Sequence, residues 1–79
     1  MTTYEDMTEK VFATGVIPDG YNGKTADVKF ALDGHTVYIV TKTGYFRSHF
    51  VGMADIPDAL WTMTHHPQIR NYVSHLQAV

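Results

Sequence analysis

The sequence predicts an α+β domain with a three-stranded antiparallel sheet and residues 10–17 as an alternative fourth strand. One N-terminal helix and two C-terminal helices are expected to pack on one face of this sheet. Two observations predict this class. Apolar and polar residues alternate from Ala26 to Val51, which is typical of a sheet with one buried face. The apolar period then becomes helical after Gly52. Residues 1–79 are expected to form a single domain, because a chain of this length supports one core.

A capping-box pattern marks the start of the N-terminal helix, with Thr3 as the cap and Asp6 three residues later. The preferred interpretation continues this helix until Gly15 ends it. The competing interpretation makes residues 10–17 a strand, because their β-branched and aromatic side chains suit a sheet. The Pro-Asp-Gly and Asn-Gly turn signals then predict a loop over residues 18–24.

Two glycine-containing turns fix the register of the three predicted strands. If Asp33-Gly34 forms the centre of a two-residue hairpin, Phe30 lies opposite Val37, and Thr43-Gly44 can form the next turn. Cross-strand neighbours point to the same side of a sheet. One face then collects an apolar set, which is Val28, Phe30, Leu32, Val37, Ile39, Phe46 and Phe50. The opposite face, predicted to be open, collects Asp27, Lys29, Thr36, Tyr38, Val40, Lys42, Tyr45, Arg47 and His49.

Two short helices are predicted after the sheet. Asp55 precedes Ile56-Pro57, which is a typical helix start, and Pro67 stands where the second helix begins. In the first of these helices, Trp61 is expected to anchor the core, because a large aromatic contributes heavily to burial. The second helix carries an apolar stripe with helical spacing, formed by Ile69, Tyr72, Val73 and Leu76.

Composition excludes several classes of function. Six basic and eight acidic residues give a net charge of −2, which does not match the strongly basic surface of a phosphate-binding domain. The chain has no cysteine, so it has no disulfide, thiolate metal site or cysteine nucleophile. No apolar stretch approaches the length of a membrane span. A cytoplasmic protein without a membrane partner is therefore expected, in the host cytoplasm if it is phage-encoded.

No motif predicts catalysis, a metal or a cofactor. Residues 20–25 resemble a phosphate loop only until the spacing is counted, because the first glycine of that pattern would fall at Pro18. No two of the five histidines have the i, i+4 spacing of a helical metal site. The chain is therefore expected not to be an enzyme.

The open sheet face is the predicted partner-binding surface. Tyrosine and arginine are enriched in the residues that dominate protein interfaces, and three of them share this face with basic neighbours. The predicted binding residues are Tyr38, Tyr45, Arg47, Lys29, Lys42 and His49. An alternative acidic surface, suited to a basic groove on a partner, comprises Glu5, Asp6, Glu9, Asp55 and Asp58.

These observations favour a non-enzymatic protein-binding module that blocks a functional surface of a larger protein or protein–nucleic-acid complex. In size and overall character the chain resembles the small inhibitors encoded by phages and mobile elements, including anti-CRISPR proteins. That resemblance implies an inhibitor of a nucleic-acid-binding groove. Two alternatives stay open. One is a single-stranded nucleic-acid binder that stacks bases on Tyr38 and Tyr45, and the other is a small homodimeric structural protein.

Overall fold

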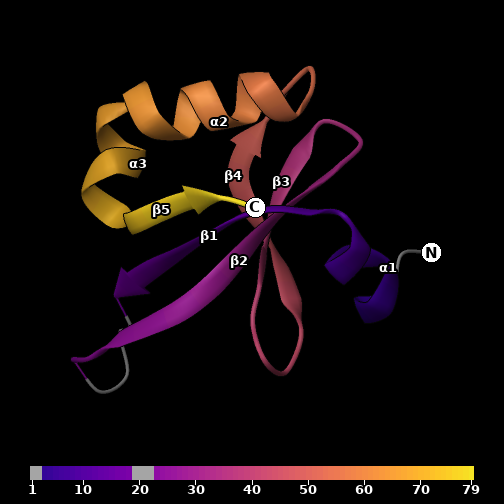
Figure 1. The fold of residues 1–79 in the computed structure, drawn as a ribbon, viewed down its shortest axis with the longest axis horizontal. Helices are drawn as coiled ribbons and strands as arrows, with labels where there is room; N and C mark the ends of the chain where they lie inside the picture. The colour runs from indigo at the N-terminus through magenta and orange to yellow at the C-terminus, as the bar shows by residue number, and fades with distance from the viewer. Residues whose placement is uncertain (1–2, 19–22) are drawn as a thin grey trace.

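Within the described residues, the chain forms one five-stranded antiparallel sheet and three short helices (Figure 1). A computed structural model describes residues 3–18 and 23–79, so most of the predicted loop over 18–24 lies outside the described residues. The strand order is β4-β3-β2-β1-β5. The elements are α1 (Tyr4–Glu9), β1 (Val11–Pro18), β2 (Thr25–Asp33), β3 (Thr36–Val40), β4 (Tyr45–Val51), α2 (Ile56–His65), α3 (Pro67–Tyr72) and β5 (Ser74–Ala78).

The predicted three-stranded sheet is wrong, and the first additional strand is β1. The capping box at Thr3 is present, but α1 ends at Glu9, where the Lys10 N–H donates to the Met7 carbonyl at 3.0 Å. The preferred helix up to Gly15 is therefore wrong, and the competing strand forms instead. β1 pairs with β2 along its whole length, so the backbone hydrogen bonds of the sheet replace those of the helix.

The second additional strand, β5, replaces the end of the predicted C-terminal helix. α3 stops at Tyr72, and the chain then runs antiparallel beside β1. The Val79 N–H donates to the Phe12 carbonyl at 3.0 Å. Without β5, the outer side of β1 would be an exposed edge, and pairing satisfies its backbone groups.

The apolar stripe in this region reaches the core through two different backbone conformations. Ile69 is buried from α3, whereas Val73 is buried and Leu76 is half-buried from extended backbone. His75 has a φ of 54° and lies in the irregular stretch of β5 opposite Gly15. This bulge interrupts the alternation of β5, so Leu76 turns toward the core.

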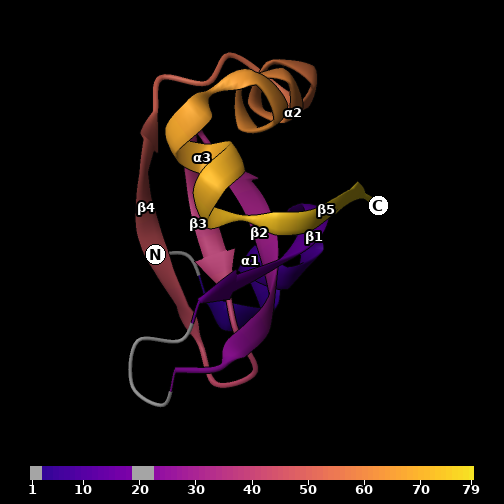
Figure 2. The ribbon, with the colours of Figure 1, turned by 90° about the vertical axis from the view of Figure 1, so that its left-hand side faces the viewer.

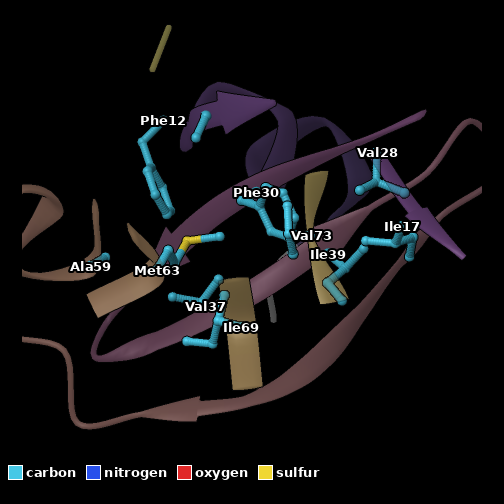
Figure 3. Close-up of a cluster of buried hydrophobic side chains, with 11 residues drawn as sticks. Phe12, Ile17, Val28, Phe30, Val37, Ile39, Ala59, Met63, Ile69 and Val73 are labelled. Atoms are coloured by element: carbon cyan, nitrogen blue, oxygen red, sulfur yellow. The ribbon is translucent and has the colours of Figure 1, made fainter. Parts of the chain in front are cut away.

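The helices pack on both faces of the sheet, which corrects the prediction that all three pack on one face. α2 and α3 cover the face whose core cluster includes Val37, Phe30, Met63 and Ile69 (Figure 3). α1 covers part of the opposite face, where Met7 is fully buried. Figures 1 and 2 show α2 and α3 together on one side of the sheet and α1 apart from them.

Both hairpins differ from the predicted register but keep the predicted faces. The first turn is centred on Gly34-His35, so Phe30 pairs with Ile39. In the second, the Thr41 N–H donates to the Gly44 carbonyl at 2.7 Å, which makes Lys42-Thr43 the central residues. The pairings next to both turns are displaced by two residues, and a displacement of two leaves every side chain on its own face. Beyond the irregular stretch of β4, Val51 lies opposite Thr36, as the predicted register has it.

The predicted core role of Trp61 is wrong, because its side chain is 61% exposed. The buried positions of α2 are Ala59 and Met63, four residues apart on one side of the helix. Trp61 stands two residues after Ala59, which places it on the opposite side. Its indole ring stacks on the His65 ring with 4.4 Å between centroids.

Candidate protein-binding site

The predicted open face is partly closed by α1. Tyr38 and Tyr45 are half-buried in the cluster that contains Met7, and their rings meet edge to face with 5.8 Å between centroids. The hydroxyl of Tyr4 donates to the Thr41 carbonyl at 2.6 Å and holds α1 against the sheet. The two predicted binding tyrosines therefore help to anchor a helix.

The four basic residues of the predicted surface are exposed, but they belong to two different places. Lys29 and Lys42 line a hollow of about 460 Å³ between α1 and the sheet. Arg47 and His49 lie on β4 at the end of the sheet. The structure therefore divides the predicted six-residue surface, and Arg47 and His49 are the members at an exposed strand edge.

The hollow beside α1 has a mixed polar lining. A row of directly opposed residues crosses its floor, with Lys29 between Thr14 of β1 and Val40 of β3. His75 and Asp27 also line it, but no hydrogen bond joins them within the described residues. Among the described residues, this hollow therefore holds no hydrogen-bonded pair of His75 and Asp27.

The alternative acidic surface is not assembled as one patch. Glu5, Asp6 and Glu9 lie on α1, whereas Asp55 and Asp58 lie at the start of α2 on the other side of the sheet. Both α2 carboxylates also accept backbone hydrogen bonds. The Asp58 N–H donates to Asp55 Oδ1 at 2.9 Å, and the Ala54 N–H donates to Asp58 Oδ2 at 2.9 Å. These groups serve as helix caps.

The β4 strand forms one edge of the sheet. Among the described residues it pairs with β3 alone, and its seven residues make it longer than β5 at the other edge. An irregular stretch follows Arg47. There the hydroxyl of Ser48 donates to the Val37 carbonyl at 2.6 Å and accepts the Phe50 N–H at 3.1 Å. An edge strand leaves backbone donors and acceptors on its outer side, which another chain can pair with.

A groove of about 520 Å³ opens between β4 and α3 on the α2/α3 side of the sheet. Its two walls carry large exposed aromatics, since Phe46 of β4 is 50% exposed and Tyr72 of α3 is 44% exposed. Its lining comprises Ile39, Phe46, Arg47, Ser48, His49, Phe50, Gln68 and Tyr72. An apolar groove therefore runs beside the sheet edge.

The sequence prediction missed Phe46, Tyr72 and Gln68 as surface residues. Phe46 and Tyr72 have core periodicity, and periodicity alone does not reveal how far a covering helix extends. α3 contains only six residues and leaves Phe46 half exposed. The position of Phe46 on the last strand of a meander is the sequence signal that could have identified it, because such a strand is a candidate edge.

Two further properties concern the described ranges 3–18 and 23–79. None of their helices has the length and apolar character needed to cross a bilayer. They also contain no group of three or more histidine, aspartate or glutamate residues placed to hold a metal ion. Comparison of the chain with protein-family models, with curated proteins and with solved structures finds no match.

Proposed function

We propose that this chain is a non-enzymatic protein-binding module that holds an extended segment of a larger partner along the β4 edge and in the groove beside α3. The observation that carries the proposal is the position of an apolar groove next to an edge strand of seven residues. Strand addition uses these two features together. Main-chain hydrogen bonds to the edge supply affinity, and alternate side chains entering a groove supply specificity.

The exposed aromatics give this site a source of binding free energy. Phe46 and Tyr72 are about half exposed, so a bound segment can remove further apolar area from water. Complete burial of a Phe side chain from full exposure is worth about 1.5–3 kcal/mol. Half of that value at each ring, together with the edge hydrogen bonds, fits a transient interface more closely than a permanent one.

The proposal includes an inhibitory mode of action. A partner segment held on β4 cannot pair within its own protein or contact its own ligand, so occupation of the segment blocks its use. We place this activity in the cytoplasm, because the chain has no cysteine and reduced compartments are where such chains are common. Base stacking on Tyr38 and Tyr45 has less support, since both rings are half-buried against the cluster that contains Met7.

Selection from a display library of random segments of about nine residues tests the proposed function. Selected clones are then measured against the wild type, Phe46→Asp and Trp61→Asp. Both substitutions place a carboxylate at an exposed aromatic, but only Phe46 lies in the groove. We expect Phe46→Asp to weaken binding at least about tenfold and Trp61→Asp to leave it unchanged. Equal binding to all three proteins, or no selected clone, would contradict the proposal.

A further inference from the structure

The two sides of β4 carry different chemistry. Phe46 pairs with Ile39 of the core face and lines the groove beside α3. Arg47 pairs with Tyr38, so its side chain leaves the sheet on the opposite face, although Arg47 and His49 also line the groove. A segment added to this edge therefore meets an apolar surface on one side and the Arg47 guanidinium on the other. We propose that the bound segment is an extended strand in which apolar residues alternate with acidic ones. This inference rests on the proposed function.

The apolar half of the pattern follows from the groove. A strand added beside β4 continues the pleat of the sheet, so every second side chain of that strand enters the groove. There it meets Phe46 on the strand wall and Tyr72 on the helix wall. Aromatic and β-branched side chains form the favourable cross-strand pairs with phenylalanine, so valine, isoleucine, leucine or phenylalanine fits these positions.

The acidic half follows from the Arg47 guanidinium, which forms no ion pair with a carboxylate of the described residues. Arg47 lies opposite Tyr38 in the sheet, which provides no carboxylate. Neither Arg47 nor His49 forms an ion pair within residues 3–18 and 23–79, where the Lys10–Asp33 pair is found. Opposite charges across two strands stabilise the pair, and like charges destabilise it. The intervening residues of the segment are therefore glutamate or aspartate.

A second copy of the chain is a poorer occupant than such a segment. The sequence from Tyr45 to Val51 is nearly palindromic in residue type about Ser48. Antiparallel pairing of two copies about this residue puts Phe46 beside Phe50 of the second copy, which is favourable. The same pairing puts Arg47 beside His49 of the second copy and supplies no carboxylate. A heterologous acidic strand satisfies both sides of β4, whereas self-pairing satisfies one.

Synthetic peptides that differ only at the intervening positions test the inference. Each peptide carries valine or leucine at alternate positions, with glutamate, glutamine or lysine between them. We expect the glutamate peptide to bind at least about tenfold more tightly than the lysine peptide, with the glutamine peptide between them. The Arg47→Glu variant should invert this order. The matched Lys42→Glu variant, which changes an exposed cation in the other hollow, should retain it.

The possible results separate this inference from the proposed function. If displayed clones require Phe46 but the three peptides bind equally, or none of them binds, the alternating acidic pattern is wrong and strand addition stands. If neither clones nor peptides require Phe46, both proposals fail. Sedimentation velocity provides a third arm. A dimer that Phe46→Asp dissociates and the glutamate peptide does not would identify a second copy as the occupant and overturn the inference.

Discussion

At the scale of single residues, Gly15 of β1 lies in close contact with two core side chains. A Cβ at this position would lie 2.8 Å from Val73 Cγ1 and 3.0 Å from Phe30 Cε2. Both neighbours are buried in the core cluster, so neither side chain has room to withdraw. Glycine is therefore required here by close approach. Glycine usually destabilises the interior of a strand, but here the close packing that it permits outweighs this cost.

Gly15→Ala is expected to lower the free energy of unfolding by about 1–3 kcal/mol, the usual cost of overpacking a core. Gly44→Ala is the matched control, because no atom lies within 4 Å of its Cβ position and its φ is not positive. The control should change stability by less than about 0.5 kcal/mol. Urea unfolding followed by circular dichroism measures both. Equal stability of the two variants would show that Val73 and Phe30 do not pack on Gly15 as described.

Lys10 and Asp33 form an exposed ion pair with a distance of 2.6 Å between Nζ and Oδ1. The hydrogen bond to Asp33, with the nearby negative charge, raises the pKa of Lys10 above its ordinary value of 10.5. A raised folded-state pKa means that the pair contributes its full stability below pH 10.5. The contribution is lost as the pH rises through the folded-state pKa.

Lys10→Met should therefore be slightly less stable than the wild type at neutral pH, and the difference should disappear above the raised pKa of Lys10. The effect should also shrink in high salt, because the pair is exposed. The measurement is the difference between the urea midpoints of the two proteins at the same pH. Tyrosine titration affects both proteins, so it cancels in this difference. If the stability difference persists unchanged at alkaline pH, it arises from packing of the lysine stem and not from the ion pair.

At the scale of elements, α1 has one fully buried side chain in addition to the Tyr4 hydroxyl bond to Thr41. The helix has six residues, too few to be stable alone, and Met7 is its only fully buried residue. Met7→Ala is expected to cost about 2–5 kcal/mol. Glu9→Ala, an exposed position in the same helix, should cost less than about 0.5 kcal/mol. Thermal unfolding monitored by circular dichroism compares them. Similar losses would mean that α1 does not anchor through Met7.

An element could be predicted where its local sequence signals and its tertiary packing favour the same secondary structure. Asp55 caps α2 and Pro67 begins α3 as the sequence indicates. The alternation in β2, β3 and β4 also assigns each side chain to its face, even though both turns are displaced. The chain after Tyr72 was not predictable in the same way. Val73 and Leu76 have helical spacing, but they reach the core from extended backbone, so the spacing fits both a helix and a strand. In the structure, the chain after Tyr72 pairs with β1 as a strand.

The candidate site was half predictable for a related reason. Arg47 and His49 could be placed on an exposed face from alternation alone. Alternation also assigns Tyr38 and Tyr45 to this face, but it does not reveal that the face is partly covered. That cover comes from α1, which reaches the face through a tertiary contact. The groove depends on where α3 ends relative to Phe46, and no local pattern near residue 46 contains that information.

At the scale of the whole molecule, the sheet has two unlike edges. Both edge strands are irregular, since β5 has a bulge at His75 and β4 has a register shift after Arg47. β4 has seven residues against five in β5, and it lies beside the apolar groove. These two differences assign the proposed strand addition to β4. On that edge, antiparallel pairing of two copies about Ser48 would place no carboxylate beside Arg47.

This arrangement predicts that a single charge change converts the chain into a dimer. In antiparallel pairing about Ser48, His49→Glu places a carboxylate opposite Arg47 of the second copy, twice per symmetric dimer. Two phenylalanine pairs then form on the other side of the sheet. We expect the wild type to sediment as a monomer at micromolar concentration. The His49→Glu variant should form a dimer whose dissociation constant is at least about tenfold lower than that of the wild type.

His49→Gln removes the imidazole without adding a carboxylate and should stay monomeric. The double variant Arg47→Glu/His49→Glu opposes like charges and should also stay monomeric, so a dimer in either control would show that charge on β4 does not control self-association.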